Sequence, residues 1–136
     1  MTKKINSILF IDDDIMSNLN SKRIIEKANV AKETHCFERP EEALELLRTV
    51  FMPAGKFPEF IFLDIYMPNL DGWQVLEELK EFALKKCNTK IILLSASHDD
   101  ADRERAIKIP EVSGYMIKPL TEEYILELTQ NMPATN

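Results

Sequence analysis

Short apolar runs that end at a polar residue recur along the chain. Four such runs, rich in Ile, Leu and Phe, occupy residues 8–11, 60–63, 91–94 and 115–117. Runs of this length and composition are typical of strands buried on both faces, as in a parallel sheet covered by helices. The polar residues that follow them are Asp12-Asp13-Asp14, Asp64, Ser95 and Lys118.

Amphipathic stretches separate these runs, and apolar run and amphipathic stretch alternate five times along the chain. This alternation predicts repeated βα units and therefore an α/β fold. We expect strands over about residues 7–11, 34–37, 60–63, 90–94 and 114–117. We expect helices over about residues 15–28, 40–51, 73–82, 99–107 and from 121 to the stop at Pro133.

Two segments of the chain differ from this regular pattern. Residues 52–58 contain two prolines and a glycine, which predicts the one long loop of the chain rather than a domain linker. Residues 99–107 are polar on most sides with a thin apolar stripe, which predicts a marginal, mobile helix. The weakness of that helix is itself a candidate functional feature.

The polar residues that close the strands should converge on one site. In an open α/β sheet, ligands bind outside the carboxyl ends of the strands, where the strand order reverses. The acidic run, Asp64, Ser95 and Lys118 all follow strands. We therefore expect them to meet at this edge of the sheet.

Size and hydropathy limit the kinds of protein that the chain can be. With 136 residues the chain has room for one core, so we expect a single domain over residues 1–136 with its core at about 5–131. No apolar run approaches the roughly 20 residues of a membrane span, and the amino-terminal apolar stretch is too short and too acidic for a signal sequence. We expect a cytoplasmic protein that does not bind membranes.

Charge and cysteine usage narrow the possible partners and sites. The net charge of −6 and the absence of a clustered Lys/Arg stripe argue against nucleic-acid binding. Cys36 and Cys87 have no closely spaced partner, so we expect ordinary structural cysteines. His35 and His98 lack the spacing of metal ligands, and we assign them no role.

The charges at the expected site suggest its chemistry. Asp12, Asp13 and Asp64 would repel one another unless a cation joined them, and Mg²⁺ prefers carboxylate oxygens, water and phosphate. A carboxylate beside Mg²⁺ and Lys118 is suited to attack phosphorus, and Ser95 could donate a hydrogen bond to a phosphoryl oxygen. Taken alone, the acidic run has another interpretation, a solvated turn that caps the next helix.

The same residues fall into motifs that resemble a known family over nearly the whole chain. The chain resembles the receiver domain of two-component response regulators. The motifs that carry this resemblance are Ile11-Asp12-Asp13, Leu63-Asp64-Ile65-Tyr66-Met67-Pro68-Asn69-Leu70-Asp71-Gly72, Ser95-Ala96 and Lys118-Pro119.

The resemblance implies a fold and a set of roles. It implies a flavodoxin-like, doubly wound sandwich with strand order 2-1-3-4-5, and a cis peptide bond between Lys118 and Pro119. Asp64 would be the phosphoacceptor, Tyr115 the switch aromatic that turns inward when Ser95 moves toward the phosphoryl group, and Lys118 the lysine of the family's signature. The implied Mg²⁺ ligands are Asp13, Asp64, the backbone carbonyl of Tyr66, and Asp12 acting mostly through water.

We therefore expect a non-enzymatic, stand-alone phosphoacceptor that depends on Mg²⁺. Its donor would be a histidine kinase or histidine phosphotransfer protein, and its output would pass to an unidentified protein partner from a monomer or weak homodimer. Two alternatives stay open. Asp12-x-Asp14 also resembles the opening motif of haloacid-dehalogenase-type phosphatases, with Asp12 as nucleophile, and the chain could be a receiver-like interaction module that is never phosphorylated.

Overall fold

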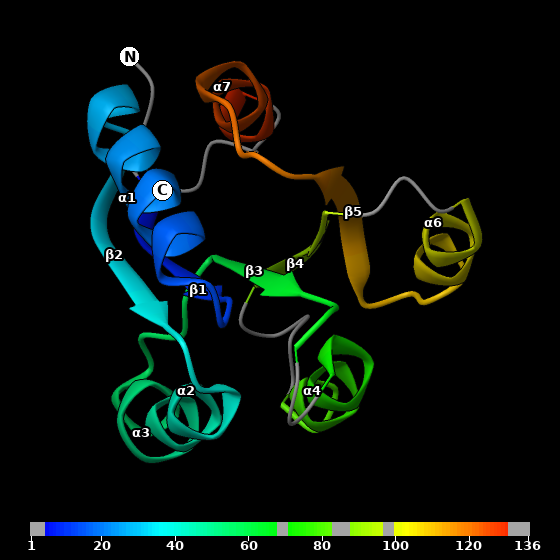
Figure 1. The fold of residues 1–136 in the computed structure, drawn as a ribbon. Coiled ribbons are helices and arrows are strands. Elements are labelled where there is room, and N and C mark those ends of the chain that lie inside the picture. Colours follow the sequence, from blue (N-terminus) through cyan, green and yellow to red (C-terminus); the bar gives the residue numbers. More distant parts are fainter. Residues whose placement is uncertain (1–4, 68–70, 83–87, 97–99, 131–136) are drawn as a thin grey trace.

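Strands and helices alternate along the described part of the chain in the computed structural model (Figure 1). The structure describes residues 5–67, 71–82, 88–96 and 100–130. The strands are β1 (Ile5–Ile11), β2 (Ala31–Phe37), β3 (Phe60–Asp64), β4 (Lys90–Ser95) and β5 (Val112–Ile117). The helices are α1 (Ile15–Ala28), α2 (Pro40–Leu46), η1 (Leu47–Phe51), α3 (Met52–Ala54), α4 (Gly72–Leu79), α6 (Asp100–Ile107) and α7 (Glu122–Gln130).

The strands form one parallel sheet in the order β2-β1-β3-β4-β5. The expected doubly wound, flavodoxin-like topology is thereby confirmed. The order reverses beside β1, because β2 lies on one side of β1 and β3 on the other. The carboxyl ends of β1 and β3 therefore flank the crevice in which ligands bind in folds of this kind.

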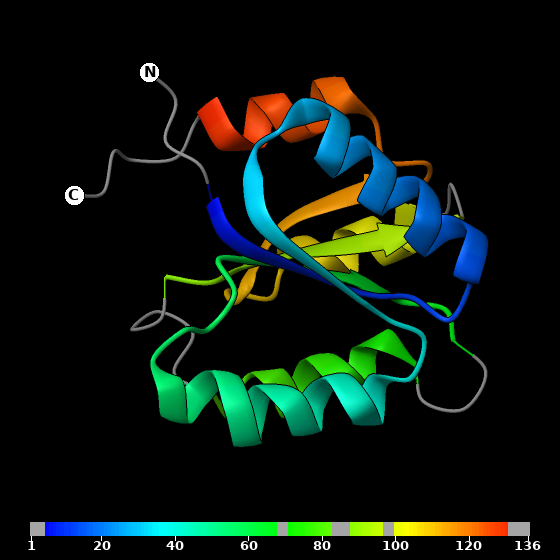
Figure 2. The same ribbon diagram turned by 90° about the vertical axis from the view of Figure 1, so that its left-hand side faces the viewer.

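Helices cover both faces of the sheet, which gives three layers (Figure 2). Helices α1 and α7 lie on one face, and α2, α3, α4 and α6 lie on the other (Figure 1). Successive residues of a strand point to opposite faces, so β1 contributes to two separate cores. Ile8 and Phe10 pack in the cluster beneath α1 and α7, whereas Leu9 and Ile11 pack in the cluster on the opposite face. This double burial explains why the strands consist of continuous apolar runs.

The helical segment after Pro40 extends further than expected. The sequence predicts a loop over residues 52–58, yet α3 continues the helix through Pro53, and only the later part of that range is irregular. The intervening η1 is a π-helix, and at its end the Met52 N–H donates to the carbonyl of Leu47, five residues earlier. Proline has no N–H to donate, and a widened turn accommodates the interrupted ladder. The helix then ends at Gly55, whose φ of 67° is left-handed, a common helix stop.

Three strands also begin earlier than the apolar pattern suggests. β1 begins at Ile5, β2 at Ala31 and β5 at Val112. In β2 and β5 the hydrogen-bonded ladder extends into residues that are partly buried or exposed, which an apolar pattern does not mark. Thr121 begins the last helix as expected, since its Oγ1 accepts a hydrogen bond of 3.2 Å from the Tyr124 N–H. The predicted stop at Pro133 lies outside the described residues.

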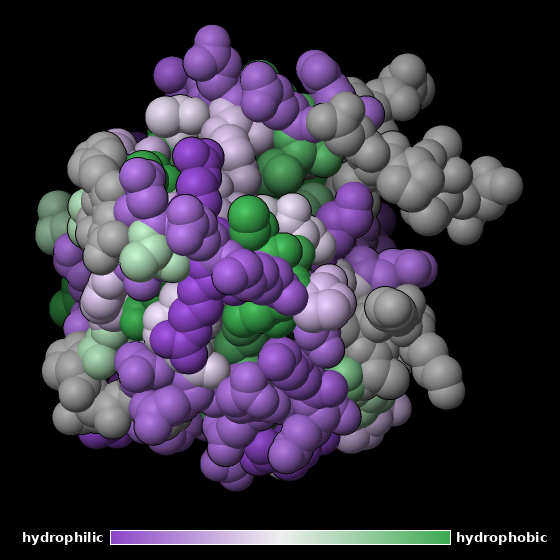
Figure 3. All heavy atoms as spheres, turned by 90° about the vertical axis from the view of Figure 1, so that its right-hand side faces the viewer, coloured by the Kyte–Doolittle hydropathy of each residue, from purple (hydrophilic) through white to green (hydrophobic). Residues whose placement is uncertain are grey.

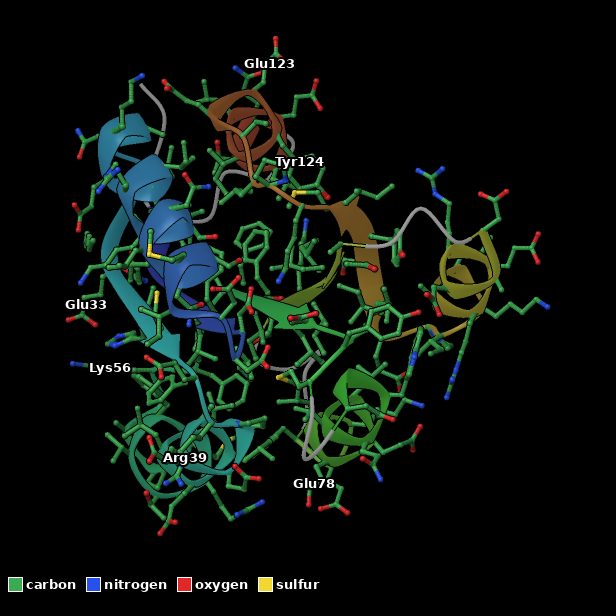
Figure 4. All side chains as sticks on the ribbon, viewed as in Figure 1. Glu33, Arg39, Lys56, Glu78, Glu123 and Tyr124 are labelled. Carbon is green, nitrogen blue, oxygen red and sulfur yellow. The ribbon has the colours of Figure 1, made fainter. Side chains whose placement is uncertain are left out.

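Charged side chains of the helices lie mostly on their outer sides. Glu78 of α4 and Glu123 of α7 point away from the sheet (Figure 4). No helix among the described residues combines the length and the hydropathy needed to cross a membrane.

Candidate phosphoacceptor and cation site

Asp12, at the end of β1, is held by hydrogen bonds on both carboxylate oxygens. Its side chain is 1% exposed. Oδ1 accepts from the Asp14 N–H at 3.0 Å, and Oδ2 accepts from the Ser17 hydroxyl at 2.6 Å. The backbone is fixed as well, because the Asn18 side-chain amide donates to the Asp12 carbonyl at 2.8 Å. The first turn of α1 therefore fixes the position of this carboxylate.

The two other aspartates of the acidic run differ in role. Asp13 is exposed beside the buried Asp12. Asp14 caps α1, since its carboxylate accepts from the N–H groups of Met16 at 3.0 Å and Ser17 at 3.4 Å. The capping interpretation of the acidic run thus holds for Asp14, while Asp12 and Asp13 stay available to a site.

Asp64 ends β3 and is 4% exposed. Its Oδ1 accepts from the Tyr66 N–H at 3.0 Å, so the backbone turns back toward the carboxylate immediately after the strand. The chain then returns closely past this turn at Gly72, where a Cβ atom would lie 2.4 Å from the Asp64 carbonyl oxygen and 2.4 Å from the Ile65 Cα. Only glycine fits at that position. Asp71 begins α4 just before it, with a capping box to Gln74.

Lys118 joins the two buried carboxylates. Its Nζ lies 2.7 Å from Asp12 Oδ2 and 3.0 Å from Asp64 Oδ2. The Lys118 N–H donates to the carbonyl of Ser95 at 2.8 Å, which ties the end of β5 to the end of β4. The Lys118–Pro119 peptide bond is cis, as the resemblance implies. The structure thus brings the residues that end four strands together at one edge of the sheet.

Burial and charge act differently on the two buried carboxyl groups. Burial raises the pKa of Asp64 to about 6, and the nearby charge of Asp12 adds to the rise, while the Tyr66 N–H and Lys118 oppose it. Burial also acts to raise the pKa of Asp12, but hydrogen bonds from Lys118, Ser17 and the Asp14 N–H outweigh it and hold the pKa below its ordinary value. Asp64 is therefore the carboxyl group whose negative charge is less well compensated.

Three carboxylates at this edge suit a small divalent cation. One ligand oxygen from each of Asp12, Asp13 and Asp64 can be chosen so that all lie within 4.8 Å of one another. Oxygens on opposite sides of a Mg²⁺ ion are about 4.2 Å apart, since each lies at about 2.1 Å from the ion. With Lys118 the three carboxylates leave a formal charge of −2, which a divalent cation would neutralise. The donor set therefore fits Mg²⁺ in ligand type and charge, and its oxygens lie within 4.8 Å of one another, slightly above the separation of two direct ligands.

Two aromatic residues lie around this edge. Tyr66 is 51% exposed, and its hydroxyl donates to the carboxylate of Asp102 on α6. Tyr115 on β5 is half-buried against the core, and its hydroxyl is buried with no hydrogen-bond partner among the described residues. Ser95 is fully buried at the end of β4.

Sequence analysis does not predict the roles of three residues in this region. Ser17 and Asn18 lie in the first turn of an amphipathic helix, where no periodicity marks them as partners of Asp12. Asp102 is 36 residues from its partner Tyr66, in a segment distinguished only by its polarity. His35 lies at 3.3 Å from Glu33 on the edge strand, away from the site. His98 and Cys87 lie outside the described residues.

Cys36 has the structural character expected of it. Its Sγ lies 3.7 Å from the carbonyl of Asn18, and burial raises the pKa of the thiol. A raised pKa disfavours the reactive thiolate at neutral pH.

Comparisons with known proteins identify the family of the chain. The family described as the response regulator receiver domain matches residues 8–130. The nitrate/nitrite response regulator protein NarL of Escherichia coli is 28% identical over 89% of this chain, which spans 51% of NarL's own length. The probable methanogenesis regulatory protein FilR2 of Methanothrix harundinacea is 27% identical over 85% of this chain and 74% of its own.

Solved structures extend the similarity to the fold. A two-component response regulator from Cytophaga hutchinsonii superposes with a TM-score of 0.87 at 32% identity, covering 94% of this chain and 96% of that one. The chemotaxis protein CheY4 of Vibrio cholerae has the same fold, with a TM-score of 0.71 at 19% identity over 93% of this chain and 97% of its own. Because the family match covers most of the chain, the protein belongs to the response regulator receiver domain family.

Proposed function

We propose that this chain is a phosphoacceptor in which Asp64 takes a phosphoryl group from a phosphohistidine donor in a Mg²⁺-dependent reaction. The observation that carries the proposal is the contact of Lys118 with Asp64, 3.0 Å from its Oδ2, beside two further carboxylates. Receiver domains bind Mg²⁺ at an acidic pocket and act with histidine kinases and downstream targets, so the donor would be a histidine kinase or histidine phosphotransfer protein.

The proposed transfer forms one bond and breaks one. A carboxylate oxygen of Asp64 attacks phosphorus while the bond between phosphorus and the histidine nitrogen breaks, and that nitrogen keeps the bonding electron pair. Lys118 stabilises the negative charge on the phosphoryl oxygens, and Ser95 donates its hydroxyl to one of them. The residues that would hold Mg²⁺ are Asp13, Asp64 and the Tyr66 carbonyl, with Asp12 acting through water. A bound Mg²⁺ would neutralise charge on the phosphoryl group during transfer.

The contacts of Asp12 favour Asp64 as the nucleophile. The carboxylate oxygens of Asp12 already accept hydrogen bonds from Ser17, Lys118 and the Asp14 N–H. This leaves Asp12 with little free acceptor capacity for an attack on phosphorus. A phosphatase of the haloacid-dehalogenase type, with Asp12 as nucleophile, is therefore disfavoured. An interaction module without phosphorylation would have no use for Lys118 between two buried carboxylates.

We place the output surface on the face formed by α6, β5 and α7. Figure 3 shows this face, where apolar side chains gather within a hydrophilic surround. Ile107 of α6 is 72% exposed, and Ser95 and Tyr115 lie on the two strands beside that helix. A protein partner would bind this face after phosphorylation, without nucleic acid or membrane, and the chain would act as one cytoplasmic domain, monomeric or weakly dimeric.

The test is to incubate the protein with Mg²⁺ and acetyl phosphate and to locate the added mass. One phosphoryl group should be added to the wild type and none to Asp64→Asn. Asp71→Asn is the matched control, because it replaces an exposed carboxylate nearby with a residue that also caps helices well. A label that survived in Asp64→Asn but vanished from Asp12→Asn would establish the phosphatase alternative instead.

A further inference from the structure

One side chain connects the acceptor loop to α6. Tyr66 is fixed at both ends, because its N–H donates to Asp64 Oδ1 at 3.0 Å and its hydroxyl donates to the carboxylate of Asp102. A tyrosine with 51% of its surface exposed would ordinarily sample several rotamers. The hydrogen bond to Asp102 selects one of them.

The strand order determines where the ring of Tyr66 lies. β4 is the neighbour of β3 on the side toward β5, and α6 packs against β5. A side chain that starts after β3 and reaches α6 must therefore cross the carboxyl end of β4. Ser95 closes that strand, so the side chain of Tyr66 passes the end of the strand next to the one that Asp64 closes.

Helix α6 holds Asp102 in position through few other contacts. Only Ala106 of this helix is buried. The guanidinium of Arg105 lies 4.0 Å from the ring centroid of Trp73, at the start of α4. Asp102 and Arg105 are three residues apart and so share one side of the helix. These two side-chain contacts of α6 thus go to residues that bracket the acceptor loop, one on each side of it.

We infer that Asp102 is a positioning residue that holds the Tyr66 ring across the mouth of the acceptor site and thereby slows loss of the phosphoryl group. This inference rests on the proposed function. In hydrolysis, the oxygen of a water molecule attacks phosphorus, the bond between phosphorus and the Asp64 oxygen breaks, and the carboxylate leaves with the electron pair. Both protons of the water stay with the product, which leaves as dihydrogen phosphate.

The ring acts on this step by excluding the attacking water. Hydrolysis requires water in line with the bond that breaks, and a ring held over the site reduces the time during which that position is open. If Asp102 no longer accepts the hydrogen bond, the ring leaves the site for part of the time, and the phosphorylated lifetime shortens.

The experiment measures first-order loss of the phosphoryl group by intact mass, after removal of the phosphodonor and in saturating Mg²⁺. Asp102→Ala and Tyr66→Phe each remove one partner of the hydrogen bond and should shorten the lifetime about fivefold, the factor that corresponds to a typical net hydrogen bond. The double variant should be no faster than either single one, because both remove the same interaction. Effects that multiply in the double variant would overturn the inference.

Conservative and control variants separate positioning from charge. Asp102→Asn keeps an acceptor oxygen and should keep a lifetime within about twofold of wild type, since a neutral acceptor retains part of the bond. Glu104→Ala removes an exposed carboxylate from the same helix and should leave the lifetime unchanged. An unchanged lifetime in Asp102→Ala, or an Asn variant as fast as the Ala variant, would refute the role of this contact.

The outcomes also distinguish this inference from the proposed function. If the wild type is phosphorylated on Asp64 but Asp102→Ala decays at the wild-type rate, the function stands and the inference fails. A label retained in Asp64→Asn would overturn both. If Asp102→Ala proved unfolded by its thermal midpoint, Tyr66→Phe would decide alone, because it deletes only a hydroxyl from a half-exposed ring.

Discussion

The ammonium of Lys118 lies 3.0 Å from Asp64 Oδ2, across a site in which Asp64 is 4% exposed. The Lys118 ammonium also forms an ion pair with Asp12, at the shorter distance of 2.7 Å from Asp12 Oδ2. One cation is thus shared between two buried anions. Burial raises the pKa of Asp64 to about 6, and its contact with Lys118 only partly offsets this rise. Asp12 is also buried, but the hydrogen bonds from Lys118, Ser17 and the Asp14 N–H together lower its pKa.

The raised pKa of Asp64 predicts that this residue destabilises the metal-free protein above pH 6. Between pH 3.8, the ordinary pKa of an aspartate, and about pH 6, Asp64 is protonated more fully in the folded protein than in the unfolded chain. The stability that Asp64 contributes is therefore present at low pH and is lost as the pH rises through this range. Asp64→Asn should be more stable than wild type at pH 7 by about 1–3 kcal/mol. The difference should shrink toward pH 4.

Urea unfolding in the presence of a chelator, between pH 4 and pH 7.5, measures this dependence. Glu78→Gln, which replaces an exposed carboxylate on α4, is the control and should give a difference that does not change with pH. A stability difference for Asp64→Asn that stayed constant across the range would show that burial of Asp64 does not govern its ionisation.

Mg²⁺ should stabilise the unphosphorylated protein, because it relieves repulsion among Asp12, Asp13 and Asp64. At ten times its dissociation constant the ion adds about 1.4 kcal/mol, which raises the melting temperature of a domain of this size by about 5 °C. Asp13→Asn should abolish most of the shift, since Asp13 is the exposed member of the cluster. Asp14→Asn, which keeps a capping side chain, should retain it, and an equal shift in both variants would exclude the proposed ligands.

Much of the fold follows from the sequence because the parallel sheet leaves a strong pattern. Strands buried on both faces, such as β1 and β3, must be continuously apolar, so their ends could be predicted to within a residue or two. The order of the strands came from the resemblance to receiver domains and not from the apolar pattern. The helix through Pro53 was missed, because a π-helical turn has no sequence signature that competes with two prolines and a glycine.

The strand-end residues of the site were predictable, and their supporting contacts were not. Asp64 and Lys118 each close an apolar run, and the sheet brings strand ends together. The hydrogen bonds of Ser17 and Asn18 to Asp12 depend on how the first turn of α1 is oriented over β1. The pairing of Tyr66 with Asp102 depends on where α6 packs, which its weakly amphipathic sequence does not encode.

Gly72 should be irreplaceable even by alanine. A methyl group there would lie 2.4 Å from the Asp64 carbonyl oxygen and from the Ile65 Cα, and backbone atoms cannot move aside as a flexible side chain can. Gly72→Ala should therefore cost about 3 kcal/mol in the free energy of unfolding, the upper part of the range for overpacking, and should reduce phosphorylation of Asp64 by displacing the loop.

Gly55→Ala provides the comparison for Gly72. Nothing lies within 4 Å of its Cβ position, but its φ is 67°, so only the strain of a left-handed residue of about 1–2 kcal/mol applies. Phosphorylation should be unaffected there. Equal losses of labelling in both variants would indicate that the close approach at Gly72 does not position Asp64.

Phosphorylation should change the environment of Trp73, the one tryptophan in the chain. The Arg105 guanidinium on α6 lies 4.0 Å from its ring centroid, and a cation at this distance from an indole face interacts with the ring electrostatically. Two connections from the acceptor to α6 would transmit the change, one through Tyr66 and Asp102 and one through Ser95 and the strands beside it. Movement of α6 should therefore alter the tryptophan emission when acetyl phosphate and Mg²⁺ are added.

Arg105→Gln should remove most of this response while Asp64 is still phosphorylated, because the charge over the ring is gone. An identical response in Arg105→Gln would locate the change in the acceptor loop instead, and an emission that never changes would exclude α6 from the output surface.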